Sequence, residues 1–363
     1  MTELLEARNV SKVFGAGLVH KAQTIALQDF SFKIDGETPS VTAIVGESGS
    51  GKTTLVRLLL GLTTPTTGEV LYRGKDLRHL TAQERRSYLG DVQAIFQDPF
   101  EVFNPFYKVD HVLESPIRNF GLAKSRQARR ALMVEALSAV GLQAGETLGR
   151  YPHQLSGGQR QRIMVARALL LRPRLIIADE PVSMVDASLR ATILNSLLTL
   201  NREFGISLIY ITHDLTTAYQ ISEDIIVLYR GVMAEAGDIQ LVVRQPEHPY
   251  TRLLVGSIPL PDPDEPWQGE RALGRPATDL QPAGDSYCPF HQRCPYAMPI
   301  CVEEAPPLFR TAPHRVSACY LYREAPALAT DRMDEIFGGV RRSSRAVEQS
   351  SSRADDIPIT SSS

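Results

Sequence analysis

The chain has 363 residues, of which 43% are hydrophobic and 22% charged, so it can form one large domain and a smaller one. Its formal net charge is −2 without a long basic block, which argues against a function in binding nucleic acid. No apolar run approaches the roughly 18 residues of a membrane helix, and the N-terminus lacks a signal-peptide pattern. We therefore expect a cytoplasmic protein whose four cysteines are reduced.

An apolar run ending at Val45 leads into the stretch GESGSGKTT, which has the spacing G-x-x-x-x-G-K-[ST] of a phosphate-binding loop. Glycines leave room for backbone N–H groups around a polyphosphate, and the lysine reaches the β- and γ-phosphates. A helix follows, because leucines recur at its period at positions 55, 58, 59 and 62. We expect ATP to be bound by Gly46, Glu47, Ser48, Gly49, Ser50, Gly51, Lys52, Thr53 and Thr54, with the Thr53 hydroxyl on Mg²⁺.

A second stretch, LIIADEP, is a predicted buried strand that ends in two adjacent carboxylates. Asp179 is placed to hold Mg²⁺ through water. Glu180 points to the other side of the strand end, which suits a general base that orients the attacking water. The pair predicts hydrolysis of the bound nucleotide.

The stretch LSGGQRQRIMVARALL places a serine and two glycines at the start of a predicted helix, whose free first-turn amides suit an anion. This is a second phosphate site in one chain, and a single nucleotide does not need two. We therefore expect the loop of one subunit and Ser156-Gly157-Gly158 of a partner to enclose ATP together.

These motifs resemble, in order and spacing, the ATP-binding cassette (ABC) ATPases over about residues 5–238. The resemblance implies an α/β P-loop fold with a RecA-like core, an N-terminal antiparallel β subdomain and an inserted helical subdomain at about 98–170. It implies that Gln97 contacts Mg²⁺ and the water, that Asp186 crosses the dimer interface and that His213 holds the γ-phosphate. Gln159 completes the LSGGQ motif, and Phe14 matches the aromatic that stacks on adenine, although a core aromatic is the alternative.

The helical subdomain has support from the residues themselves, because Ala131, Leu132, Val134, Leu137 and Val140 lie near a helical repeat. In ABC ATPases this subdomain contacts the membrane partners. The stretch QDPFEVFNP and the later HPYT, residues 248–251, resemble the branch that imports dipeptides, oligopeptides, nickel or oligosaccharides.

Two functions fit this sequence. The first is the ATP-hydrolysing subunit of an ABC importer, peripheral on the inner face of the membrane, whose partners are a second ATPase subunit, two permease subunits and, indirectly, an external solute-binding protein. The second is a soluble ABC ATPase acting on ribosomes or DNA. Such relatives carry two cassettes or a long inserted coiled coil, and this sequence has neither, which favours the importer.

The predicted organisation has a cassette at 1–240, a small irregular C-terminal domain at 241–325 and a disordered tail at 326–363. Dense prolines from Pro259 to Pro282 indicate a linker. The tail is rich in serine and arginine and has too few apolar residues to fold alone.

All four cysteines lie in the C-terminal domain, at positions 288, 294, 301 and 319. Their spacings match neither the C-x₂-C pairs of common zinc sites nor the ferredoxin pattern. The segment resembles the C-terminal element of peptide-importer ATPases, which implies that Cys288, Cys294, Cys301 and Cys319 hold a [4Fe–4S] cluster. Tetrahedral zinc and plain reduced thiols are the alternatives.

Overall fold

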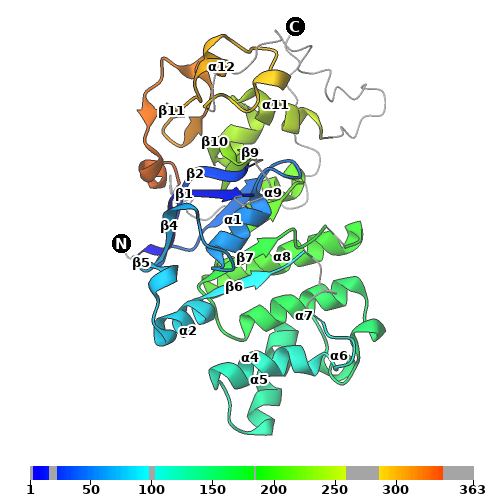
Figure 1. Cartoon of the computed structure of the whole chain (residues 1–363). Helices are drawn as coiled ribbons and strands as arrows, with labels where there is room; N and C mark the ends of the chain where they lie inside the picture. The colour runs from blue at the N-terminus through cyan, green and yellow to red at the C-terminus, as the bar shows by residue number, and fades with distance from the viewer. Residues whose placement is uncertain (1–2, 16–22, 98–102, 184, 259–285, 338–363) are drawn as a thin grey trace, which may run out of the picture.

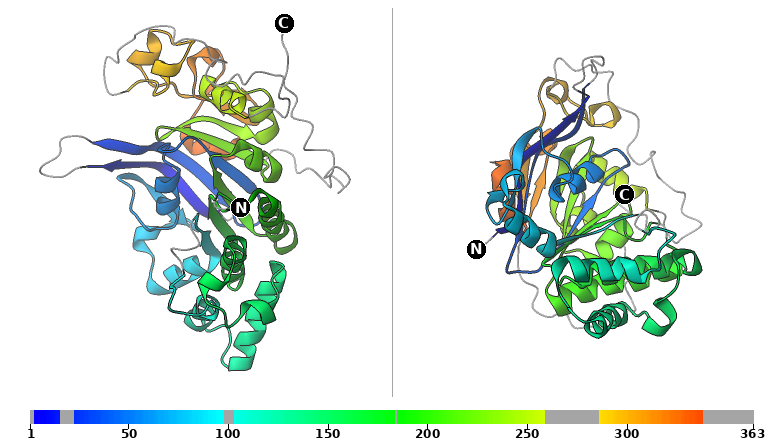
Figure 2. Two further views of the ribbon diagram at one scale, coloured as in Figure 1. Left: turned by 90° about the vertical axis from the view of Figure 1, so that its right-hand side faces the viewer. Right: turned by 60° about the horizontal axis from the view of Figure 1, so that its bottom comes forward.

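The computed structural model describes residues 3–15, 23–97, 103–183, 185–258 and 286–337. In Figure 1 the helices α4, α5 and α6 lie at one end of the molecule, and the C-terminal elements α12 and β11 lie at the other. The two further views in Figure 2 show the same separation. No helix in the described part of the chain has the length and apolarity needed to cross a membrane.

A nine-stranded sheet forms the centre, in the order β13-β11-β12-β10-β9-β3-β8-β7-β6. The strands from β9 to β6 run parallel to one another, and the remaining neighbours pair antiparallel. Every residue of β3 and β8 is buried, as expected for parallel strands covered on both faces. The strands are β3 (Val41–Val45), β6 (Val92–Ile95), β7 (Leu175–Asp179), β8 (Ser207–Thr212), β9 (Asp224–Tyr229), β10 (Val232–Asp238), β11 (Leu308–Ala312), β12 (Arg315–Ser317) and β13 (Ala327–Leu328).

A second, antiparallel sheet has the order β2-β1-β4-β5, which confirms the predicted N-terminal β subdomain. Its apolar face shares one core with helix α1 and with the central sheet, through residues such as Phe30, Phe32, Leu55 and Ile226. The strands are β1 (Glu3–Phe14), β2 (Thr24–Asp35), β4 (Thr67–Tyr72) and β5 (Lys75–Asp76).

Helices cover both faces of the central sheet and build the helical subdomain. The α-helices are α1 (Lys52–Leu59), α2 (Ala82–Asp91), α4 (Asp110–Phe120), α5 (Arg126–Ala139), α6 (Ala144–Thr147), α7 (Gly157–Leu169), α8 (Ala187–Phe204), α9 (Leu215–Ile221), α10 (Ile239–Arg244), α11 (Pro249–Gly256) and α12 (Ile300–Glu303). The 3₁₀ helices are η1 (Leu77–His79), η2 (Pro152–Gln154), η4 (His291–Arg293), η5 (Tyr320–Tyr322) and η6 (Thr330–Glu335).

The helix after the loop, α1, is shorter than the leucine pattern predicts. Leu62 is 63% exposed and lies outside the helix. Gly61 adopts a left-handed conformation with φ 63°, and the Leu62 amide donates to the Arg57 carbonyl at 2.8 Å. This 6→1 hydrogen bond is the Schellman ending of a helix. The expectation for Leu62 was therefore wrong because a glycine stop outweighed the periodicity.

The predicted helical repeat over residues 131–140 corresponds to α5 and its C-cap residue Val140. Leu137 and Val140 are buried, but Val134 is 36% exposed and Met133 is buried beside them. Helix α5 belongs with α4 and α7 to one apolar core, together with one face of the central sheet.

The C-terminal region extends the central sheet, because β12 pairs with β10 in the register Glu235 to Ser317. The predicted disordered tail is wrong for residues 326–337, which contain β13 and η6. Its few apolar residues suffice because Leu328, Met333 and Ile336 pack into a core that the N-terminal strands have already formed. Residues 338–363 and the proline-dense segment 259–282 lie outside the described residues, and the predicted domain boundaries stay predictions.

We predict that Ile336→Ala destabilises the protein by about 2–5 kcal/mol, since it leaves a cavity in the shared core. Ile336 is fully buried, whereas Leu321 is 42% exposed, so Leu321→Ala is the matched control. Urea unfolding of both variants measures the difference. Equal midpoints would show that residues 326–337 do not contribute to the core.

Candidate functional site

The carboxyl ends of four neighbouring parallel strands bring the predicted ATP-site residues to one edge of the sheet. The phosphate loop follows β3, and His213 follows β8. Asp179 ends β7 and Glu180 comes next, while Gln97 follows β6. Ligands of open α/β sheets bind at this edge, outside the carboxyl ends of the strands.

Two loop glycines are required by their surroundings. Gly46 has φ 156°, and a Cβ there would lie 2.2 Å from the Leu228 carbonyl oxygen. Gly51 has φ 106°, and a Cβ there would lie 2.5 Å from the Ala26 carbonyl oxygen. At Gly49, with φ 80°, nothing lies within 4 Å of an added Cβ. The loop is thus closely packed at its two ends and open at its centre, as a cradle for phosphate requires.

Lys52 is the cation of this loop. Its Nζ donates to the carbonyl oxygens of Gly46, at 2.6 Å, and Glu47, at 2.9 Å. Burial lowers the pKa of Lys52, and the nearby carboxylates of Glu180, Asp179 and Glu47 oppose that effect. The ammonium therefore interacts with three carboxylates. It lies at the N-terminus of α1, where the positive end of the helix also favours a phosphate.

The two carboxylates of LIIADEP have different surroundings. Burial, and then the charge of Glu180, raise the pKa of Asp179, while Lys52 lowers it. Glu180 has a left-handed backbone, with φ 45°, and its Oε1 lies 3.1 Å from Nδ1 of His213. The His213 side chain is 60% exposed, which is incompatible with a core histidine. The structure thus joins the predicted base and the predicted γ-phosphate ligand.

Three further predicted residues lie at the surface. Gln97 is exposed after β6, and Thr53 is exposed in the first turn of α1. Phe14 ends β1 with 44% of its surface exposed, and Lys12 Nζ lies 5.2 Å from its ring centroid. Its exposure removes the alternative of a core aromatic.

The LSGGQ segment begins α7, as predicted, and its serine and glutamine bond to each other. Ser156 Oγ accepts from the Gln159 amide at 3.2 Å, and Gln159 Oε1 accepts from the Ser156 amide at 2.9 Å. This reciprocal capping box fixes the helix start. Gly158 packs against α8, since a Cβ there would lie 2.6 Å from Leu189 Cδ1. Figure 1 places α7 next to the helical subdomain and away from α1.

Asp186 precedes α8 as its N-cap residue and is exposed. Its side chain makes no capping hydrogen bond. It is therefore accessible to a partner molecule.

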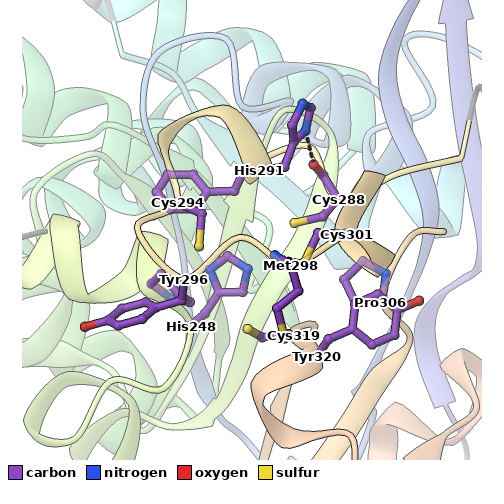
Figure 3. Close-up of a pocket in the computed structure, with 12 residues that line it drawn as sticks. His248, Cys288, His291, Cys294, Tyr296, Met298, Cys301, Pro306, Cys319 and Tyr320 are labelled. Carbon is purple, nitrogen blue, oxygen red and sulfur yellow. Dashed lines mark hydrogen bonds between the residues drawn. The ribbon is translucent and has the colours of Figure 1, made fainter. Parts of the chain in front are cut away.

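All four cysteines line one pocket, together with His248, His291 and Met298 (Figure 3). Burial, reinforced by the neighbouring thiols, raises the pKa of Cys288 and of Cys319 to about 12. Among the described residues, no three His, Cys, Asp or Glu side chains form a group that could hold a metal ion. The structure thus brings the cysteines together without forming a metal site.

Sequence reasoning missed that the C-terminal region reaches the phosphate loop. Arg293 Nη1 and Nη2 donate to the Glu47 carboxylate at 2.9 and 3.1 Å. The Glu47 amide donates to the Tyr250 hydroxyl oxygen at 2.8 Å. The arginine next to Cys294 and the tyrosine of HPYT were visible in the sequence, but no local pattern pairs residues that are 246 positions apart.

Two family models match the chain. One, described as ABC transporter, covers residues 27–183, and the other, described as oligopeptide/dipeptide transporter C-terminal region, covers residues 234–301. The putative oligopeptide transport ATP-binding protein YkfD of Bacillus subtilis is 42% identical, over 89% of this chain and 96% of its own length. The chain belongs to the ABC transporter ATP-binding family. As an ABC ATPase it is expected to use ATP and Mg²⁺.

Other relatives agree. The oligopeptide transport ATP-binding protein OppF of Salmonella typhimurium is 42% identical, over 78% of this chain and 84% of its own. Among solved structures, the dimeric ATP-binding cassette MJ0796 bound to ADP and phosphate is 30% identical with a TM-score of 0.57, covering 65% of this ABC ATPase and 99% of that chain. The predicted cassette fold is thereby confirmed.

We predict that Gly46→Ala lowers both the melting temperature and ATP affinity of this ABC ATPase, because the added Cβ collides with a backbone carbonyl that cannot move aside. Gly74→Ala is the matched control: Gly74 has φ 78° and nothing lies within 4 Å of an added Cβ, but it lies in the turn between β4 and β5, outside the phosphate loop, so the variant carries only the strain of its backbone, about 1 kcal/mol. Thermal unfolding with and without ATP compares them. A smaller effect at Gly46 would contradict the packing argument.

Proposed function

We propose that this ABC ATPase powers the import of peptides. The observation that carries the proposal is the match of residues 234–301 to the C-terminal region of oligopeptide and dipeptide transporters, with relatives named for oligopeptide transport over most of the chain. That region is part of the folded protein here, since α11 packs on the central sheet and β10 lies within it. The alternative, a soluble ABC ATPase acting on ribosomes or DNA, has no comparable support.

The strand-end residues receive distinct roles. Lys52 binds the β- and γ-phosphates, and the loop amides surround them. Thr53 and Gln97 would hold Mg²⁺ directly and Asp179 would hold it through water, and the ion would screen the phosphate charge. Their support is chemical, because a hydroxyl, an amide and a carboxylate at one sheet edge form the oxygen donor set that Mg²⁺ prefers.

Glu180 orients and deprotonates the attacking water, and His213 donates to the γ-phosphate. The 3.1 Å contact between them supports this assignment, since it holds the base beside the residue that senses the reacting group. Phe14 supplies its exposed ring to adenine.

The second half of each site comes from a partner subunit. Ser156 and Asp186 are exposed at the starts of α7 and α8, and the related cassette MJ0796 is a dimer. ATP held between the loop of one subunit and Ser156, Gly157, Gly158, Gln159 and Asp186 of the other closes the dimer, and hydrolysis opens it. Two membrane permease subunits bind the helical subdomain, and an external solute-binding protein delivers the cargo.

We predict that Glu180→Gln keeps ATP binding, lowers ATP turnover by about 10² or more and abolishes peptide uptake by cells that express the complete importer. Glutamine retains the shape but not the basicity. Glu203→Gln, on the exposed side of α8, is the control and leaves both activities unchanged.

Radiolabelled peptide uptake and phosphate release are measured in parallel. Near-normal hydrolysis in Glu180→Gln would refute the role of the base. Normal peptide uptake in cells lacking this chain would refute the proposed cargo while leaving the ATPase assignment intact.

We further propose that the four cysteines hold a [4Fe–4S] cluster, with Zn²⁺ as the alternative. The support is the environment of the sulfur atoms. Burial raises the pKa of Cys288, Cys294 and Cys319, and the backbone N–H groups of Phe290, Tyr296 and Leu321 oppose that effect. The Met298 amide donates to Cys301 Sγ at 3.5 Å. Backbone N–H groups directed at sulfur stabilise thiolates, as cluster ligands require.

Bound iron would also offset the unfavourable free energy of forming thiolates in this buried pocket. The raised pKa values show that a thiolate is disfavoured there without a cation. A cluster binds each cysteine to a different iron atom, so its four ligands need not converge on one point as they do for zinc.

We predict that protein purified without oxygen is brown and contains about four iron atoms per chain, and that Cys301→Ser loses the colour and the iron. Ser257→Ala, at the C-cap of the neighbouring α11, keeps both. Metal analysis and absorption spectra provide the readout. One zinc per chain in colourless protein would favour the alternative metal, and metal-free protein would reject both.

A further inference from the structure

Glu47 of the phosphate loop is held by the C-terminal region through two of its polar groups. Its carboxylate pairs with both terminal nitrogens of Arg293, and its amide donates to the Tyr250 hydroxyl. Its carbonyl accepts from Lys52, inside the loop. We call Arg293 and Tyr250 the Glu47 clamp.

The clamp residues are themselves fixed. Tyr250 is fully buried in α11, with its ring 4.5 Å from that of Tyr229 and 5.6 Å from that of Phe290. The Arg293 guanidinium lies 5.7 Å from the Phe290 ring and 6.0 Å from the Tyr229 ring. Both side chains therefore rest on one aromatic cluster beside the end of β9.

A buried carboxylate anchors the start of α11. Glu235 is fully buried in β10 and accepts from the amides of Glu247, at 3.1 Å, and His248, at 2.9 Å. These amides immediately precede the helix that carries Tyr250. The path from the central sheet to the loop amide is thus made of buried hydrogen bonds and aromatic contacts.

Electrostatics gives the contact a consequence for nucleotide binding. Glu47 places a negative charge in the loop that must accept a polyphosphate, and its carboxylate repels the phosphate charges. Arg293 neutralises that charge by a bidentate pair. Fixing the Glu47 amide and carboxylate also orders the loop before ATP arrives, which reduces the entropy lost on binding.

We propose that Arg293 and Tyr250 are positioning residues of the ATP site, through which the C-terminal region sets the affinity of the phosphate loop for ATP. The proposal rests on the ABC ATPase assignment and does not depend on the cargo or on what the cysteines bind.

The test uses the full-length protein, with ATP affinity from a fluorescent analogue, KM and kcat from phosphate release, and thermal unfolding as a fold check. Arg293→Ala weakens ATP binding about threefold to tenfold, the range for one half-exposed bidentate ion pair, with kcat nearly unchanged. Arg293→Lys recovers part of the loss because it restores the charge. Tyr250→Phe keeps the aromatic packing and weakens binding about twofold to fivefold, since the Glu47 amide loses its acceptor.

A double-mutant cycle separates the proposed path from general destabilisation. Glu47→Gln removes the charge that Arg293 neutralises, so Arg293→Ala has a much smaller effect in that background. The double variant binds ATP more tightly than Arg293→Ala alone. Arg310→Ala is the matched control, because Arg310 pairs with Glu335 at 2.9 Å in the same region and with similar exposure, yet away from the loop.

Each outcome decides a part of the proposal. Wild-type ATP affinity in Arg293→Ala overturns the role of the arginine, and wild-type affinity in Tyr250→Phe overturns that of the tyrosine. If Arg293→Ala loses the same ATP affinity with and without Glu47→Gln, its effect does not act through Glu47. If Arg310→Ala loses as much ATP affinity as Arg293→Ala, general destabilisation explains both. Either result overturns the proposed path.

Discussion

The parallel pairing of β3 with β8 on one side and β9 on the other determines where chemistry can occur in this protein. Because neighbouring parallel strands end at the same edge, the loop after β3 lies beside His213 after β8 and the carboxylates after β7. Neither the antiparallel N-terminal sheet nor the helical subdomain supplies the groups around Lys52. Those additions serve the site by shielding the sheet and by presenting surfaces to other subunits.

Local motifs predicted this edge well, because each motif includes both the strand and the residue that follows it. The loop, LIIADEP and ITHD all lie where their motifs placed them. Errors arose where tertiary context overrode a local pattern. Leu62 fits the leucine period but follows the Gly61 stop, and the tail after residue 326 looks too polar to fold yet places Ile336 in a core formed elsewhere. Contacts between distant segments, such as Arg293 with Glu47, could not be predicted, because no short sequence pattern indicates which residues pair.

The C-terminal region therefore has a closer relation to the ATPase than its position after the cassette suggests. Strand β12 extends the central sheet, and Phe290 lies in one apolar core with Val45, which immediately precedes the phosphate loop. Arg293 ends η4, in which the His291 amide donates to the Cys288 carbonyl at 3.1 Å and the Cys294 amide donates to the His291 carbonyl at 3.2 Å, so the arginine is held within the backbone that carries two of the cysteines.

Charge balance explains why the loop requires this support. Three carboxylates, those of Glu47, Asp179 and Glu180, lie near Lys52 before any nucleotide is present. ATP would add several more negative charges, which Mg²⁺ and the loop amides would offset in the proposed site. The carboxylate of Glu47 has its own partner, Arg293. Glutamate at this loop position and arginine beside Cys294 thus form one functional unit, and a cassette without the C-terminal region would bind ATP against an uncompensated negative charge.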